Sequence, residues 1–470
     1  MGADAETKAA RAKPPARLER SMHGFGALLI TLSALSPSIG LFIVGDELLH
    51  QAGTATFLCF VAAGLLGVAM ACVYAELGSA FPHTGAEYTM VGRALGPAAG
   101  FGMLGLTLSG FTIAQALSGQ AMVGYLQVLA PDLPLKPTAI AIVAVVTLIG
   151  VLNIRLNALV TGLCLAVELL ALVLVAVIGF AHPARDAVSV VIHPVMQGAG
   201  GLVPTPLLVI GVAAIGSIYA FNGYGSAVYL GEEMHDAPRR MARVIFGALG
   251  IAALTMLPPL LAILVGAPDL KALVSSEHPI TAFMDAAGGP GWSKAMAAGV
   301  ALAFFNCMIA VALMAGRLLY ATARDRVWPE ALNRAFISLH PRFNSPWIGT
   351  LVMGAISLAW CFVPKGLLLI IIASGNVGFY AALCLAVIKG RMTGSTAHAG
   401  WRMPLFPLAP VFGLLALGAV VWAAAMEPKH GQAGLIALVV VLVASAVWYW
   451  LALKPGGRWA HRGPEDETFD

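Results

Sequence analysis

Two short polar stretches interrupt apolar segments of the chain and could together bind a small charged molecule. Proline removes a backbone donor, and glycine, serine and asparagine weaken a helix, so each stretch should break the helix that contains it. In lipid, broken backbone is tolerated only where protein or a watery cavity covers it. We therefore predict that both stretches line one binding site. Their residues are Ser36, Pro37, Ser38, Ile39 and Gly40 in the first, and Ala220, Phe221, Asn222, Gly223, Tyr224 and Gly225 in the second.

The ends of a broken helix carry partial charges that can hold a charged ligand. A new helix that begins after Pro37 exposes the amides of the next three residues, which suit a carboxylate. Helices that end near Ser36 and Phe221 expose carbonyl groups, which suit an ammonium group. The predicted ligand is therefore a zwitterion or an amine.

Glu168 is an acidic residue near the middle of a segment that is expected to cross the membrane, 156–182. A carboxyl group at that depth is costly, and it is a functional hypothesis by default. It can carry a proton, neutralise a cationic ligand, or act as a protonated structural group bonded to neighbouring backbone. These roles stay open, and Glu168 is the candidate for coupling to protons.

Other polar and aromatic side chains near the interruptions have two interpretations each. Gln115 and Asn306 lie near the middle of expected spans and can bond a neighbouring helix or contact a ligand. Phe221 and Tyr224 flank the second interruption and can cover a ligand or pack in the protein.

Charged residues at the ends of the interrupted segments are candidates for gates. Glu232 and Glu233 follow the second interruption, and Arg93 lies in a loop on the same expected side of the membrane. They can form a salt-bridged gate or a solvated, positively charged loop. Asp46 and Glu47 lie roughly 14 Å beyond the first interruption, at about 1.5 Å per residue, and are expected as solvated charges at the interface.

The elements that must position these residues are membrane-spanning helices. The chain has 470 residues, of which 59% are hydrophobic and 11% charged, and its mean hydropathy is +0.86. Soluble domains carry roughly 25% charged residues. We predict an all-α polytopic membrane protein with about twelve spans. The expected spans are 24–50, 54–80, 98–130, 137–153, 156–182, 206–231, 241–268, 292–322, 346–364, 366–390, 404–426 and 431–453.

The distribution of basic residues predicts the orientation of the chain. With both termini in the cytoplasm, only six of the 27 Lys and Arg residues lie on the outer side, as the positive-inside rule requires. The net charge of +4 then follows from topology, so no nucleic-acid partner is expected. The predicted location is the plasma (inner) membrane. The six outer residues are Lys136, Arg185, Lys271, Lys294, Lys365 and Lys429.

The two interrupted segments are the first and the sixth expected spans, so they cross the membrane in opposite directions. Corresponding interruptions in two inverted halves indicate a transporter site near the midplane. We predict an inverted five-plus-five helix repeat with two extra C-terminal helices. The expected units are tails at 1–22 and 454–470, a core at 23–395 with repeats at about 23–182 and 204–391, and the extra helices at 400–453.

Enzymatic and metal chemistry find no support in the sequence. All six cysteines lie in apolar runs without the paired spacing of a disulfide or metal site. All eleven histidines lie at expected helix ends or in loops. They therefore form no cluster with acidic residues at a common depth in the membrane, as a membrane enzyme would need. We expect no metal, no cofactor and no enzymatic activity.

Three further segments make the chain resemble the amino acid-polyamine-organocation superfamily of transporters. The resemblance covers most of the predicted ten-helix core. The segments run from Tyr74 to Tyr88, with the sequence YAELGSAFPHTGAEY, from Gly231 to Arg240, with the sequence GEEMHDAPRR, and from Arg317 to Pro329, with the sequence RLLYATARDRVWP.

The resemblance implies a ten-helix inverted-repeat core, usually with twelve spans, and the transport of small molecules. We expect a secondary active transporter of amino acids or small organic amines that works by alternating access, through proton coupling or exchange. Related folds bind sodium with hydroxyls of the eighth span, and residues 299–320 contain no Ser or Thr, so sodium coupling is disfavoured. The alternatives are a polyamine- or choline-type amine permease and, from another class, a channel or an amino-acid-sensing transceptor.

Overall fold

The computed structural model describes residue 18 and residues 20–152, 154–276, 278–289, 291–426, 431–457 and 459–462. Most of the tails predicted at 1–22 and 454–470 therefore lies outside the described residues. The described chain is helical except for one small antiparallel hairpin of β1 (Val195–Gly198) and β2 (Gly201–Pro204). The fold is that of an all-α polytopic membrane protein.

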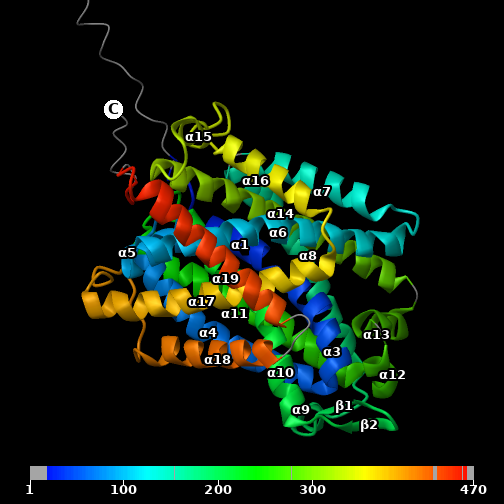
Figure 1. The fold of residues 1–470 in the computed structure, drawn as a ribbon. Coiled ribbons are helices and arrows are strands. Elements are labelled where there is room, and N and C mark those ends of the chain that lie inside the picture. Colours follow the sequence, from blue (N-terminus) through cyan, green and yellow to red (C-terminus); the bar gives the residue numbers. More distant parts are fainter. Residues whose placement is uncertain are drawn as a thin grey trace, which may run out of the picture.

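The helices occur in the order expected from the apolar runs (Figure 1). The first half contains α1 (Gly24–Leu35), α2 (Pro37–Ile39), η1 (Gly40–Gly45), α3 (Asp46–Ala52), η2 (Gly53–Ala55), α4 (Thr56–Ala80), α5 (Ala86–Leu95), α6 (Pro97–Leu129), α7 (Leu135–Gly150), α8 (Ile154–Ala181) and α9 (Ala187–Ile192). The second half contains α10 (Leu207–Ser217), η3 (Ile218–Phe221), η4 (Tyr224–Leu230), α11 (Ala237–Gly266), α12 (Leu270–Ser275), α13 (Pro279–Gly288), α14 (Trp292–Arg324), α15 (Glu330–Phe336), α16 (Trp347–Trp360), α17 (Lys365–Thr393), α18 (Leu408–Met426), α19 (Gly431–Trp448) and η5 (Tyr449–Leu453).

Eight segments of the described chain are long and apolar enough to cross a membrane. The first of them, Gly24–Ala80, contains the first two expected spans. The expected spans at 137–153 and 346–364 correspond to the shorter apolar helices α7 and α16. The sixth expected span is divided among α10, η3 and η4. The twelve-span inverted repeat stays a prediction.

Both predicted helix breaks are present in the structure. Helix α1 ends at Leu35, and Ser36 has a φ of 48° before α2 begins at Pro37. In the sixth expected span, α10 continues as the 3-10 helix η3. Gly223 then has a φ of 122° before the next 3-10 helix, η4, begins. Each helix break occurs where a proline or a glycine makes a continuous helix unfavourable.

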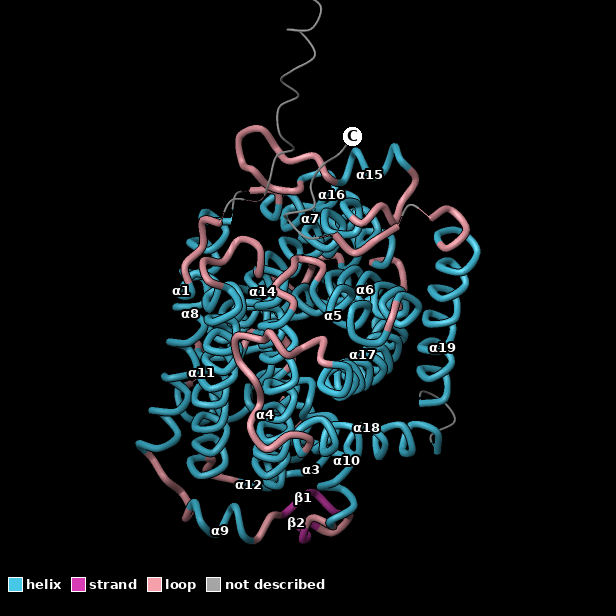
Figure 2. The backbone as a smooth tube through the Cα atoms, turned by 90° about the vertical axis from the view of Figure 1, so that its left-hand side faces the viewer, coloured by secondary structure: helices cyan, strands magenta, loops and turns pink. Residues whose placement is uncertain are grey.

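The interrupted helices lie inside a bundle that faces lipid with apolar side chains. Helix α1 contacts α8, α11, α14 and η4, while α18 and α19 pack against α17 at the edge of the bundle (Figure 2). Helix α8 exposes Leu159, Leu163, Val167 and Leu170 at helical spacing and buries Glu168. The opposed faces of α8 show that its carboxylate points into the protein while its leucines point outward.

The bundle has two distinct ends (Figures 1 and 2). We call the end with α9, β1 and β2 the hairpin end. The end with α15 and the C-terminal segment Trp459–Arg462 we call the tail end. In both views these features lie at opposite ends of the helices.

Candidate functional site

The two helix breaks contact each other. A Cβ added to Gly223 would lie 2.5 Å from the Cα of Leu35, and one added to Gly40 would lie 2.7 Å from the carbonyl oxygen of Ala220. The Tyr380 hydroxyl of α17 donates to Asn222 Oδ1 at 2.8 Å and holds the second break in place. The two polar stretches predicted from the sequence therefore form one region, in which only glycine fits at the closest approaches.

A cavity of about 250 Å³ lies beside this contact, bounded by residues of α1, α2, η1, α4, α5, α6, η3, η4, α14 and α17. This is slightly smaller than most drug-sized pockets, and it suits a ligand of few heavy atoms. The predicted residues that line it are Ile39, Gly40, Ala220, Asn222, Gly223, Gly225 and Gln115.

The other predicted binding residues lie outside the cavity lining. The Phe221 ring packs at 6.0 Å from that of Phe60, and Tyr224 packs at 6.0 Å from Tyr74. Both rings thus pack in the protein, the second of the two interpretations given above. The remaining residues outside the lining are Ser36, Pro37, Ser38 and Asn306, which surround or approach the Glu168 carboxyl.

Glu168 occupies the position predicted for a ligand's carboxylate, beside the amides that follow Pro37. Its side chain is buried, with 1% of the residue exposed. Its Oε1 accepts hydrogen bonds from the Ser36 hydroxyl at 2.8 Å and from the Ser38 amide at 2.9 Å. The Gly40 amide donates to the Ser36 carbonyl at 3.2 Å. The protein's own carboxyl therefore takes the Ser38 amide of the new helix N-terminus, and the Gly40 amide is taken by backbone.

Unsatisfied polar atoms surround the second oxygen of this carboxyl. The Asn306 amide lies beside it, and within the described chain neither Glu168 Oε2 nor either polar atom of Asn306 has a hydrogen-bond partner. Buried polar atoms are normally paired. A proton on Oε2 would supply a donor to this cluster, so the geometry suits a carboxyl that gains and loses a proton.

Gln115 fits both of its interpretations. Its Nε2 donates to the Met308 carbonyl at 2.8 Å and joins α6 to α14. The same side chain lines the cavity, and its Oε1 has no partner among the described residues. Gln115 can therefore accept a hydrogen bond from a ligand while it holds two helices together.

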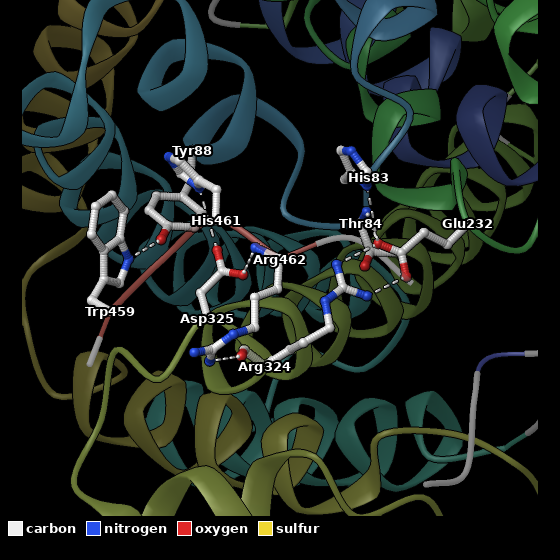
Figure 3. A network of polar contacts seen from close by, with 9 residues as sticks. All are labelled: His83, Thr84, Tyr88, Glu232, Arg324, Asp325, Trp459, His461 and Arg462. Atoms are coloured by element: carbon white, nitrogen blue, oxygen red, sulfur yellow. Dashed lines mark hydrogen bonds and ion pairs between the residues drawn. The ribbon is translucent and has the colours of Figure 1, made fainter. Parts of the chain in front are cut away.

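Two buried ion pairs lie at the tail end of the bundle, and Figure 3 shows one of them, Arg324–Glu232. The two terminal guanidinium nitrogens of Arg324, Nη1 and Nη2, donate to Glu232 at 2.7 Å, and the Thr84 amide donates to the same carboxylate at 3.0 Å. Burial acts to raise the pKa of Glu232, but the charge and hydrogen bonds of Arg324 lower it more, so the pKa lies below its usual value. Arg317 forms a second buried pair, in which its Nε and Nη2 donate to the two carboxylate oxygens of Glu233.

These contacts argue against a solvated loop at the acidic pair, while its role as a gate stays a prediction. Glu232 and Glu233 are 7% and 2% exposed, so they do not belong to a solvated loop. Arg93 is exposed, with its guanidinium 6.0 Å from the Phe81 ring centre, and takes no part in the ion pairs described here. The true partners, Arg317 and Arg324, are seven residues apart on one face of α14, a spacing that could have identified them.

The C-terminal segment binds next to these ion pairs, which the sequence did not indicate. Trp459 Nε1 donates to the Tyr88 hydroxyl at 2.8 Å, and the Arg462 amide donates to Asp325 Oδ1 at 2.8 Å (Figure 3). His461 lies 3.4 Å from the same carboxylate. The segment therefore ties α5 to the end of α14.

At the hairpin end, Asp46 differs from the expected solvated charge. Its carboxylate accepts from the Ile280 amide at 2.8 Å and lies 3.3 Å from His278, so it holds the start of α13. Glu47 is exposed, as expected.

A family model described as amino acid permease matches residues 23–447, which is nearly the whole chain. The chain belongs to the amino acid permease family. The resemblance to the amino acid-polyamine-organocation superfamily is thereby confirmed, and the protein is a permease, not an enzyme.

Several characterised and uncharacterised transporters are similar to this permease. An uncharacterized transporter of Mycobacterium tuberculosis is 28% identical over 73% of this chain and 74% of its own. A branched-chain amino acid permease of Lactococcus lactis is 24% identical over 83% of this chain and 87% of its own. A low-affinity putrescine importer of Escherichia coli is 25% identical over 61% of this chain and 62% of its own. The relatives thus include transporters of both amino acids and amines.

Proposed function

We propose that this permease is a secondary active transporter of an amino acid or small organic amine in the plasma membrane. The observation that carries the proposal is the cavity beside the contact between the two interrupted helices. Interrupted helices at corresponding places in inverted halves are typical of transporter binding sites. In this proposal the core at 23–395 consists of two such halves, and both termini are cytoplasmic.

Alternating access is supported by the difference between the two ends of the cavity. The tail end is closed by the buried pairs Glu232–Arg324 and Glu233–Arg317. The cavity lining extends in the other direction to Lys365, an exposed residue at the start of α17. This arrangement fits a state that is closed to the cytoplasm. Transport would then require the two pairs to separate and the outer side to close.

A second candidate, an amine permease, is favoured by the position of Glu168. Because Glu168 accepts the Ser38 amide, a substrate carboxylate would have to displace it, whereas an amine would not. One similar protein is named as a putrescine importer, and another as a branched-chain amino acid permease. The uptake panel described next distinguishes the two classes.

The test of the proposal is uptake by the purified protein in liposomes. A panel of labelled amino acids and amines is offered with and without an imposed pH gradient. We expect saturable uptake of at least one compound, with either stimulation by the gradient or dependence on an exchangeable substrate inside. Absence of saturable uptake for every compound would contradict the proposal, and flux that rises linearly with concentration would indicate a channel.

Replacing Glu168 with glutamine tests its role in proton coupling. Glutamine retains the size of the side chain and its bonds to Ser36 and Ser38 but cannot be ionised. If Glu168 carries the proton, uptake driven by a pH gradient should fall by about tenfold or more, which corresponds to about 1.4 kcal/mol, while exchange of substrate persists. Unchanged values for both fluxes would show that Glu168 has no coupling role.

A further inference from the structure

Glu87 is a buried carboxylate that lines the cavity but belongs neither to the helix breaks nor to the tail-end ion pairs. It is the second residue of α5, a short helix between the spans α4 and α6. Only 2% of the residue is exposed, and the cavity lining near it includes Tyr74, Thr107 and Tyr229. The cavity therefore has a negatively chargeable group in addition to the polar groups at the breaks.

Among the described residues, the side chains that hydrogen-bond to this carboxyl carry neutral hydroxyl groups. The Tyr74 hydroxyl of α4 donates to Oε1 at 3.2 Å, and the Tyr229 hydroxyl of η4 interacts with the same group. The Tyr380 hydroxyl of α17 lies farther out. Within the described chain Oε2 has no hydrogen-bond partner, and no Lys or Arg forms an ion pair with Glu87. A buried carboxylate without a cation is unusual and indicates a site for one.

Burial raises the pKa of Glu87 to about 7, although Tyr229, the Glu87 backbone amide and Tyr74 act to lower it. The group is thus largely protonated below pH 7 and largely charged above it. A cation bound beside it would favour the charged form, so cation binding and proton release are linked.

A purely structural role is the alternative. A carboxylate in the first turn of a helix can satisfy backbone amides there, and the Glu87 amide does interact with its own side chain. That role predicts that replacing Glu87 changes stability alone. It gives no reason for the side chain to line the cavity or for Oε2 to lack a partner.

We infer that Glu87, with Tyr74 and Tyr229, forms a second cation subsite, so that the permease recognises α,ω-diamines. One ammonium group would bind at the carbonyls of the helix breaks and the other at Glu87. Apolar lining residues such as Leu106 and Phe111 would accommodate the carbon chain between them. The inference rests on the proposed function, because it assigns a substrate class to the same cavity.

Binding to the purified full-length protein in detergent tests the subsite without requiring transport. Labelled 1,4-diaminobutane is displaced by diamines of three to six carbons and by the matched monoamine, 1-aminobutane. At pH 8 we expect wild type to bind the best diamine about tenfold or more tightly than the monoamine, as a charge-assisted hydrogen bond allows. In Glu87→Gln the ratio should approach one, while the monoamine affinity changes by less than about twofold.

A pH series on the wild type keeps the test independent of whether the variant folds. Because Glu87 loses its proton near pH 7 while both amino groups of the diamine stay protonated, the preference for diamines should increase between pH 6 and pH 8. Calorimetry in buffers of different ionisation enthalpy should show proton release on diamine binding near pH 7. The monoamine should show neither effect.

Matched variants distinguish the effect of the Glu87 charge from the effect of the hydroxyl groups around it. Glu87→Asp keeps the charge and should retain part of the preference, and Tyr74→Phe removes a donor to Oε1 and should raise the midpoint of the pH series. Glu330→Gln, at an exposed site on α15, should behave as wild type.

Equal binding of diamine and monoamine at pH 8, or a preference that survives in Glu87→Gln, would overturn the inference. The two proposals can fail separately. Diamine binding that depends on Glu87 without any saturable flux would refute the transport proposal alone. Saturable transport with no diamine preference would refute the subsite alone.

Discussion

Replacing Gly223 with alanine is expected to lower substrate uptake by about 100-fold or more. Gly223 has a φ of 122°, where a residue with a side chain is strained by about 1–3 kcal/mol. In addition, the new Cβ would lie 2.5 Å from the Leu35 Cα, a backbone atom that cannot rotate away. Relief requires the two helix breaks to separate, which changes the cavity itself. A combined cost of roughly 3 kcal/mol corresponds to about two orders of magnitude.

The matched control for this variant is Gly250→Ala on α11, where an added Cβ meets nothing within 4 Å. Alanine there should leave uptake within about twofold, because it only improves helix propensity. Initial uptake rates in liposomes, normalised to the amount of monodisperse protein, measure both. If the Gly223→Ala variant took up substrate at the wild-type rate, the close approach of the two helix breaks would not be required for transport.

Removing one member of the Glu232–Arg324 pair should have the second largest effect. Both residues are buried, so Arg324→Gln leaves the Glu232 carboxylate without its cation. Breaking a buried pair in this way costs about 3–5 kcal/mol. The state closed at the tail end should lose that stability, and uptake should fall by about 10-fold or more as the balance between states shifts.

Three comparisons make this result specific to the closed state. The double variant Glu232→Gln/Arg324→Gln removes both charges and should recover part of the uptake. Arg334→Gln breaks the exposed Glu330–Arg334 pair of α15 and should cost less than about 1 kcal/mol. The midpoint temperature of thermal unfolding in detergent should be lowered most by Arg324→Gln, less by the double variant and least by Arg334→Gln. Equal effects of Arg324→Gln and Arg334→Gln on both readouts would contradict a closing role for the buried pair.

The helix breaks could be predicted because their cause is local. Proline at residue 37 and glycine at residue 223 act on the turn that contains them, so an apolar pattern with such residues indicates a break. The depth of Glu168 is also a local property of its span. Its bonds to Ser36 and Ser38 join residues about 130 positions apart, and no local pattern shows them.

The partners of the acidic pair could not be chosen from the topology alone. The expected loop positions placed Arg93 near Glu232 and Glu233, but several basic residues lie on that side of the membrane. The structure instead uses Arg317 and Arg324, which the sequence assigned to the end of a span and to the loop that follows it. Such pairs depend on how α14 packs against η4, which is set by the whole bundle.

The binding residues show the same division between local and tertiary causes. Residues of both breaks, among them Gly40 and Gly223, line the cavity. Phe221 and Tyr224, by contrast, lie in the same stretch but pack against rings of α4 outside the lining. Glu87 lies within a recognised segment, yet only the fold brings it to the cavity.

The most direct test of the central claim uses Cys307, which lines the cavity and donates to the Ala34 carbonyl at the end of α1. The wild-type protein in liposomes is treated with N-ethylmaleimide, and modification of Cys307 is followed by peptide mass spectrometry together with uptake. If substrate passes between the two breaks, uptake should fall in proportion to Cys307 modification, and saturating substrate should slow that modification by about tenfold, as expected for an occupied site. Full uptake by protein whose Cys307 is completely modified would contradict the account.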